Sequence, residues 1–147
     1  MIGHSVSDLK KYSLFGGLEN GQIEKIIPLM GQEEYEGGDS IITEGNTNDK
    51  IYFITRGRVE VTREGVVLSE FKVGEAFGEM EVLEIVPSAA TIKALGGVQV
   101  MTISNKALRE IYRMDAKVFS IMLMNLARDL SRRLRRMNEL AVKKSPA

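Results

Sequence analysis

The middle of the chain, residues 33–104, alternates apolar with polar side chains and contains a glycine about every 8 to 12 residues. Such alternation is typical of strands with one buried face, and regular turns join such strands into a sandwich or a jelly roll. Glu64 and Gly65 lie between two β-rich runs, where they predict a two-residue hairpin turn. We therefore expect a mainly β fold with flanking helices. The expected strands include residues 51–56, 59–62, 66–71, 90–94 and 98–104.

The N-terminal segment, residues 1–31, predicts helices that cover the β region. Ser5 and Asp8 have the spacing of a capping box, in which each side chain bonds the backbone of the other. Asn20 is expected to cap a second helix with apolar residues at helical spacing. Pro28 lies inside that pattern and should kink or end the helix at the preceding residue.

The C-terminal segment, residues 105–147, predicts a short helix followed by a long one over residues 115–142, which Asp115 caps. A helix of about 28 residues is roughly 42 Å long and extends past a small domain. We expect its first half to cover the core and its second half to form a homodimer with a second copy. Its apolar stripe consists of Phe119, Leu123, Leu126, Leu130, Leu134, Met137 and Ala141.

The composition excludes several kinds of site. The chain has no cysteine and one histidine, so disulfides, thiolate zinc sites and histidine-rich metal centres are excluded. Glu33, Glu34 and Glu36 could suggest acid–base chemistry, but such a run is typical of a solvated strand edge. We expect no catalytic residue, no metal and no enzymatic activity. No run of 18 apolar residues occurs, so we expect no membrane span and a cytoplasmic location.

Residues 76–91 form the central motif, AFGEMEVLEIVPSAAT, with a short helix expected over residues 79–84 between two strands. Gly78 permits close backbone approach, and the amides that follow it at the helix start can bind an anion. Glu79 could accept hydrogen bonds from a sugar hydroxyl. On these residues alone, a plain strand–helix–strand connection with a glycine turn is the more common explanation.

The motif resembles the phosphate-binding cassette of cyclic nucleotide-binding domains, as in catabolite-activator-type regulators and protein kinase regulatory subunits. The family pattern, Phe-Gly-Glu-Leu-Ala-Leu and then Pro-Arg-Ala-Ala-Thr, aligns without a gap. Residues 14–18, 36–45 and 49–61 also resemble family motifs, so the resemblance spans about residues 14–134. It implies an eight-stranded jelly-roll β-barrel over residues 32–104, in one domain with the flanking helices, and a last long helix that closes on the ligand.

The resemblance also implies which residues contact a cyclic nucleotide such as cAMP or cGMP. Glu79 lies at the position whose carboxylate binds the ribose 2′-hydroxyl, and Gly78 and Met80 lie at positions that offer backbone contacts. Ala89 offers its amide beside the phosphate. The full set of candidate ligand-binding residues is Phe77, Gly78, Glu79, Met80, Ser88, Ala89, Ala90 and Arg133.

Ser88 stands where the family has its phosphate-binding arginine. A serine offers one neutral donor in place of a charged fork, and a lost charged hydrogen bond costs about 1.5–3 kcal/mol, or roughly 10- to 150-fold in affinity. Glu81 and Glu84 add negative charge nearby. We therefore expect weak binding of cAMP or cGMP, or a different ligand.

The long helix offers one further candidate contact. The resemblance aligns Arg133 and Leu134 with positions that contact the base in the transcription regulators. Leu134 has no polar side chain, whereas Arg133 could reach a base or a phosphate and replace part of the missing arginine. The alternative is a solvated arginine on a basic helix face.

Two functions follow from this pattern. The first is a stand-alone, dimeric regulatory domain that transmits a ligand-dependent helix shift to a protein partner. The second is a structural or protein-interaction module that no longer binds a nucleotide. Only residues 143–147 follow the long helix, so we expect no sequence-specific DNA binding. Residues 120–147 carry seven basic and two acidic residues, which solubilise the helix or attract an acidic partner or nucleic acid.

Overall fold

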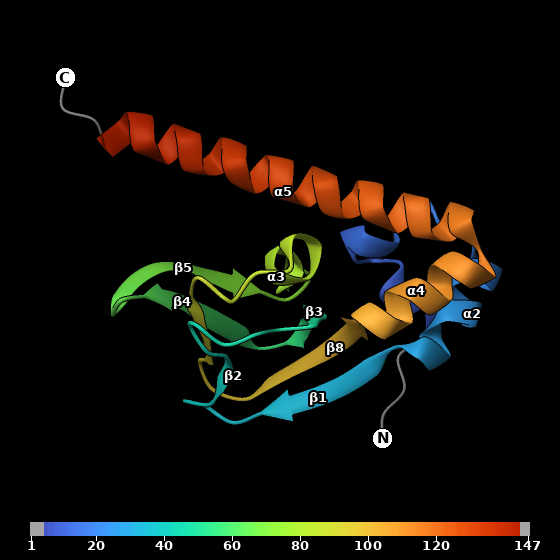
Figure 1. Ribbon diagram of the computed structural model, residues 1–147, viewed down its shortest axis with the longest axis horizontal. Coiled ribbons are helices and arrows are strands. Elements are labelled where there is room, and N and C mark those ends of the chain that lie inside the picture. The colour runs from blue at the N-terminus through green and yellow to red at the C-terminus, as the bar shows by residue number, and fades with distance from the viewer. Residues whose placement is uncertain (1–4, 145–147) are drawn as a thin grey trace.

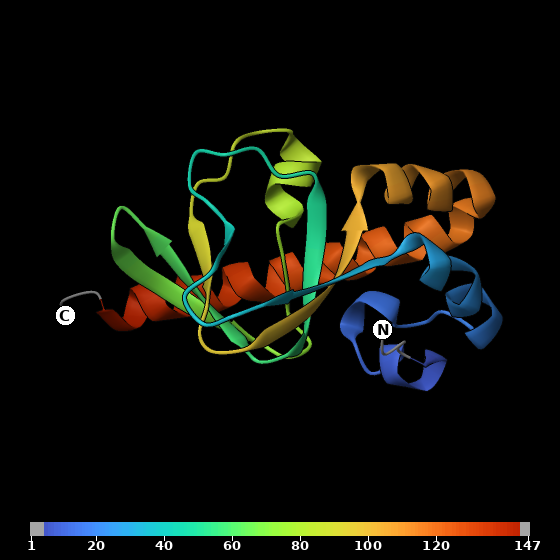
Figure 2. The same cartoon turned by 90° about the horizontal axis from the view of Figure 1, so that it is seen from below.

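The computed structural model describes residues 5–144, which form two four-stranded antiparallel sheets with helices along one side (Figures 1 and 2). The strand orders are β1-β8-β3-β6 and β2-β7-β4-β5. The strands are β1 (Gly31–Tyr35), β2 (Ser40–Ile42), β3 (Lys50–Arg56), β4 (Arg58–Arg63), β5 (Val66–Lys72), β6 (Ala76–Phe77), β7 (Thr91–Ala94) and β8 (Val98–Ser104).

The eight strands and the mainly β class confirm the prediction, but the predicted closed β-barrel is wrong. Each sheet keeps two edge strands, so the two sheets are not joined into one closed ladder. At one edge, β6 pairs with β3 through only Tyr52–Phe77 and Phe53–Ala76. The chain then leaves the sheet at Gly78, because this glycine has a left-handed backbone, with φ of 86°, and caps the helix that starts at Glu79.

The predicted hairpin turn and two of the predicted strands are present. Glu64 and Gly65, with φ of 50° and 78°, connect β4 and β5, and positive φ at both positions is what a tight hairpin of this kind needs. Strand β8 has the predicted bounds, and β7 begins one residue later than expected, at Thr91.

The N-terminal helices are short. Helix α1 (Val6–Leu9) has the predicted capping box between Ser5 and Asp8. Helix α2 (Asn20–Ile26) is capped by Glu19 and not by Asn20, because Glu19 and Gln22 form a reciprocal capping box. Helix α2 ends just before the turn that contains Pro28, as predicted. The two short 3₁₀ turns are η1 (Ser13–Phe15) and η2 (Ile27–Leu29).

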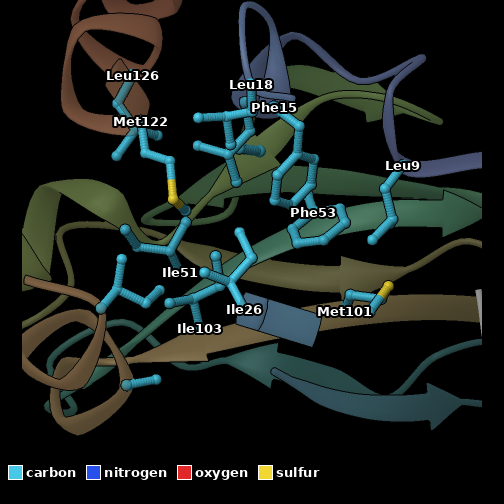
Figure 3. Packing of buried hydrophobic residues seen from close by; sticks show 14 of the residues in the cluster. Leu9, Phe15, Leu18, Ile26, Ile51, Phe53, Met101, Ile103, Met122 and Leu126 are labelled. Carbon is cyan, nitrogen blue, oxygen red and sulfur yellow. The ribbon is translucent and has the colours of Figure 1, made fainter. Parts of the chain in front are cut away.

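The buried side chains form two clusters. The first lies between the N-terminal helices, strand β3 and the C-terminal helices, where Phe15 meets Phe53 edge to face at 5.4 Å between ring centroids (Figure 3). The second lies between the two sheets and contains Val59, Val100 and the stacked rings of Tyr52 and Phe77, 4.9 Å apart. The first cluster attaches the helices to the sheets, and so it fixes the position of the first half of the long C-terminal helix.

Helix α4 (Asn105–Met114) leads to the long helix α5 (Ala116–Lys144), which runs along one side of the molecule (Figure 1). Asp115 caps α5, because its Oδ1 accepts hydrogen bonds from the amides of Lys117 and Val118. The first half of α5 packs on the helical core, as predicted. The predicted stripe is only partly right, since the buried residues of α5 are Val118, Met122, Asn125 and Leu126.

The second half of α5 packs very little. Every residue from 131 to 144 is exposed except Arg133. Leu134 and Met137 of the predicted stripe are 60% and 65% exposed. In the described part of the chain, no helix is both long and apolar enough to cross a membrane.

Candidate ligand site

Helix α3 (Glu79–Glu84) has the predicted bounds and begins directly after β6. Gly78 caps it with φ of 86°, and a Cβ at this position would lie 2.6 Å from the carbonyl oxygen of Lys50. The Asn48 amide donates hydrogen bonds to the carbonyl oxygens of Lys50 and Gly78, at 2.8 and 3.2 Å. Only glycine fits here, so the start of α3 is held against β3 by backbone contacts.

Phe77 and Met80 lie on either side of this turn and point to different environments. Phe77 is buried in the core against Tyr52, so its side chain supports the site from behind. Met80 has a largely exposed side chain. Neither side chain takes part in the polar contacts between Glu79 and Arg133.

Glu79 is only 3% exposed and is the first residue of α3. Its Oε1 accepts a hydrogen bond from Nη1 of Arg133 at 3.0 Å, while its Oε2 is buried with no hydrogen-bond partner. Burial raises the pKa of the Glu79 carboxyl, and the Arg133 guanidinium opposes part of that rise. A buried carboxylate oxygen without a donor is costly, so this atom is where a ligand would gain most.

Arg133 reaches the cassette from α5. Its Nη2 donates a hydrogen bond to the Ala76 carbonyl oxygen, and its guanidinium carbon lies 4.4 Å from the centroid of the Phe71 ring. The side chain is 19% exposed. The interpretation of Arg133 as a solvated arginine is therefore wrong, because its charge is paired and its plane covers an aromatic ring.

Ser88 is also buried, but its polar atoms are used within its own loop. Its hydroxyl donates to the Ala90 carbonyl oxygen at 2.7 Å and accepts from the Ala90 amide at 3.3 Å. Its backbone bonds to Gly45 and Asn46 on the β2–β3 loop. Ala89 is exposed. Ser88 therefore closes the loop on itself, at the position where the resemblance implies an arginine.

The cassette, residues 76–91, contains three acidic residues and no basic one. Among residues 5–144, Arg133–Glu79 is the only ion pair that reaches it. No group of three or more His, Asp or Glu residues in the same range could hold a metal ion.

Two clefts adjoin the cassette. One, of about 400 Å³, lies between α5 and the sheets, with Ala76, Lys72 and Arg133 in its wall. The other, of about 510 Å³, lies outside α3 and is lined in part by Glu81 and Ile85. The first cleft is the candidate ligand cleft, because Arg133 lies in its wall and bonds the Glu79 carboxylate.

The comparisons with known proteins agree with this geometry. The family model "Cyclic nucleotide-binding domain" matches residues 32–115, so the chain belongs to this family. The cAMP-dependent protein kinase regulatory subunit of Debaryomyces hansenii is 31% identical over 104 residues, which are 70% of this chain and 23% of that protein. This chain thus spans less than a quarter of the curated relative.

Solved structures show the same fold. A cyclic nucleotide-binding domain from Methylobacillus flagellatus superposes with a TM-score of 0.86 at 22% identity, covering 97% of this chain and 83% of that one. The catabolite activator protein of Thermus thermophilus gives a TM-score of 0.75 at 25% identity, covering 88% of this chain and 62% of that one. The resemblance inferred from the cassette and the three further motifs is therefore confirmed.

The structure brings Glu79 and Arg133 into direct contact, and it places Phe77 in the core. Both charged residues were predicted to contact the ligand, but their pairing was not predicted, and neither were the contacts of Arg133 with Phe71 and Ala76. The available signal was a cassette rich in carboxylates on one side and a basic helix on the other. That signal did not identify which arginine would pair.

Proposed function

We propose that this chain is a regulatory domain in which a ligand at Glu79 changes the position of the second half of α5, and that a protein partner detects the change. The ion pair between Arg133 and Glu79 carries the proposal, because it joins the ligand site directly to the helix. The domain acts by binding and not by catalysis, and the cytoplasmic location expected from the sequence is part of the proposal.

The exposure of α5 supports this coupling. Arg133 is the only residue between 131 and 144 that is not exposed, so one side chain holds this half of the helix to the sheets. A ligand that bonds the Oε1 atom of Glu79 must displace Arg133, which donates a hydrogen bond to it. Displacing Arg133 releases residues 131–144, and a partner that binds one position of this segment better than the other responds to the ligand.

The released segment also offers surfaces for assembly. Leu134 and Met137 share a helix face that no described residue covers. Apolar residues exposed along a helix in this way are typical of helix–helix interfaces. We therefore include a homodimer through α5 in the proposal, with the basic residues around Arg135 facing an acidic partner.

Weak binding of cAMP and cGMP is the third part of the proposal. Ser88 contributes no charge, and its hydroxyl already donates to Ala90. The phosphate of a cyclic nucleotide would therefore lie beside the cassette carboxylates without a paired cation.

Limited trypsin digestion of the full chain tests the coupling, because Arg135 and Arg136 are exposed cleavage sites within the released segment. Millimolar cAMP or cGMP, enough to occupy a weak site, should accelerate cleavage there while sites in the sheets are unchanged. Unchanged cleavage at every concentration would contradict the proposal, and slower cleavage would show that the ligand captures the helix instead of releasing it.

A second candidate function is a structural or interaction module that binds no nucleotide. The closed Ser88–Ala90 loop favours it, because a loop whose polar groups bond one another needs no ligand. This function predicts unchanged proteolysis and no heat of binding with any nucleotide.

A further inference from the structure

The cleft of about 400 Å³ between α5 and the sheets is lined by more basic than acidic side chains. Its two carboxylates are those of Glu75 and Asp129. Its four basic residues come from β5 and α5, and they are Lys72, Arg132, Arg133 and Arg136. The cleft therefore has two positive charges in excess, although the whole chain has a formal net charge of zero.

Both carboxylates of the cleft already have partners within the protein. Glu75 Oε1 accepts a hydrogen bond from the Lys72 amide at 3.2 Å. Asp129 accepts from the Ser13 hydroxyl at 2.7 Å and from Nη1 of Arg132 at 3.0 Å. Because Ser13 is 116 residues away in the sequence, its contact ties Asp129 to the N-terminal segment, and Asp129 in turn orients the Arg132 guanidinium in the cleft wall.

Three of the cations still offer hydrogen-bond donors to the cleft. Among residues 5–144, neither Lys72 nor Arg136 forms a salt bridge. Arg132 keeps further donors, because a guanidinium has five N–H groups and Asp129 accepts from one of its nitrogens. The donors therefore come from β5 on one side of the cleft and from two successive turns of α5 on the other.

This arrangement fits a phosphate group better than a carboxylate. A phosphate monoester carries nearly two negative charges at neutral pH and three strong acceptor oxygens that point in different directions. Arginine forks and lysine ammonium groups are the side chains that proteins use to bind phosphate. A carboxylate carries one charge and its oxygens lie in one plane, so it meets cations on opposite sides of a cleft less well.

We propose that this cleft is a phosphate-binding site, formed by Lys72, Arg132 and Arg136, that clamps the second half of α5 onto the sheets. Lys72 belongs to β5 and both arginines belong to α5, so a phosphate between them bridges sheet and helix. The inference goes beyond the proposed function, because this ligand does not bind Glu79 and because it holds the helix in place.

NMR titration of the isotope-labelled full chain with inorganic phosphate, at constant ionic strength, locates the site and measures its affinity. Amide signals of residues 72–75 and 129–136 should shift and saturate, because these segments line the cleft. Acetate at the same ionic strength should give no saturable shift. Equal shifts with acetate, or shifts spread evenly along α5, would overturn the proposal.

Single variants test the donors. Lys72→Met and Arg136→Met should each weaken phosphate binding at least about fivefold, because each removes a charged hydrogen bond. Both side chains are exposed, so neither change should impair folding. Arg135→Met is the matched control, because it removes the same charge from an exposed residue outside the cleft. Equal weakening by R135M and R136M would show that phosphate responds only to the charge of the helix, which would overturn the site.

A peptide with neutral ends and one phosphoserine distinguishes the two sources of the phosphate group. Tighter binding of this peptide than of inorganic phosphate assigns the site to a phosphorylated segment of a partner protein. Equal or weaker binding assigns it to a small phosphate compound. The same peptide with unmodified serine should not bind, and equal binding by both peptides would overturn the phosphate assignment.

Hydrogen exchange tests the clamp. Saturating phosphate should slow the exchange of residues 131–144 several-fold in the wild type, and unchanged exchange with phosphate bound would overturn the clamp. The outcomes are distinct from those of the proposed function. If phosphate binds while cyclic nucleotides leave trypsin cleavage unchanged, the proposed function fails and this site stands. If cyclic nucleotides accelerate cleavage while phosphate shifts no cleft amide, this site fails and the proposed function stands.

Discussion

Arg133 on α5 and Glu79 on α3, 54 residues apart in the chain, form an ion pair of 3.0 Å in which Glu79 is almost completely buried. A buried pair of this kind adds little stability by itself, since desolvation offsets the attraction. Removing only one of the two partners is costly, because the other charge is then buried without a partner. The pair therefore fixes the position of the second half of α5, residues 131–144, which little else holds.

Arg133→Met should release the second half of α5. Amide hydrogens of residues 131–144 should exchange several-fold faster, because this side chain is the only one in that segment that is not exposed. The free energy of unfolding should fall by about 1–3 kcal/mol, since Glu79 loses its partner but can take up a proton. Hydrogen exchange with mass spectrometry measures the first effect and urea unfolding the second.

Arg135→Met is the matched control, because it removes the same charge two residues later from an exposed side chain. It should change neither exchange nor stability by a measurable amount. Equal exchange in R133M and R135M would show that Arg133 does not hold the helix.

Glu79 should make stability depend on pH. Its pKa is raised in the folded state by burial, so the folded protein binds this proton more tightly than the unfolded chain does. The wild type should therefore lose stability relative to Glu79→Gln as pH rises from about 4 through the folded-state pKa. Urea unfolding of both proteins from pH 4 to pH 8 measures the difference.

Glu84→Gln changes an exposed carboxyl of the same helix and should track the wild type across this range. In Arg133→Met the loss of stability should extend to higher pH, because the guanidinium no longer lowers the Glu79 pKa. If the wild type instead gained stability relative to E79Q as pH rises, the pKa of Glu79 would be lowered by folding and not raised, which would contradict the prediction.

Gly78→Ala should destabilise the fold by about 2–4 kcal/mol, because it combines a left-handed backbone with a clash. The new Cβ would lie 2.6 Å from the Lys50 carbonyl oxygen and 2.8 Å from the Asn48 amide nitrogen. Gly21→Ala, in helix α2 with nothing within 4 Å of the new Cβ, should instead be neutral or stabilising. Thermal unfolding compares the two, and equal losses would contradict the packing described for Gly78.

The dimer can be tested on the exposed stripe of α5. Leu134→Glu with Met137→Glu should convert a dimer to a monomer in light scattering, because both side chains are more than half exposed on one face. Met124→Glu changes an exposed methionine in the packed half of the helix and should leave the dimer intact. A wild type that is monomeric at high concentration removes the interface from the account.

Much of the fold could be predicted because its signals are local. Strand β8 and helix α3 have the predicted bounds, since alternation and the glycine before Glu79 act within a few residues. The barrel that the resemblance implied is not closed, because each sheet keeps two edge strands, and a resemblance in short motifs does not show whether those edges pair. The cap at Glu19 was missed because asparagine is a more common cap residue than glutamate, which favoured Asn20. The structure instead pairs Glu19 with Gln22 in a capping box.

The site was only partly predictable, for a related reason. The positions of Glu79 and Ser88 follow from the cassette pattern, but their partners lie outside it. The pair with Arg133 is a long-range contact that no spacing rule contains. The closure of Ser88 onto Ala90 depends on a rotamer, which a resemblance does not supply.

With Ser88 in place of the family's arginine, we expect the cassette to lack a phosphate subsite. Calorimetric titration of the wild type and Ser88→Arg with cAMP measures this loss. The account predicts wild-type binding weaker than micromolar, and roughly 10- to 150-fold tighter binding by S88R, because a charged hydrogen bond is restored. Micromolar binding by the wild type, with no gain in S88R, would contradict it.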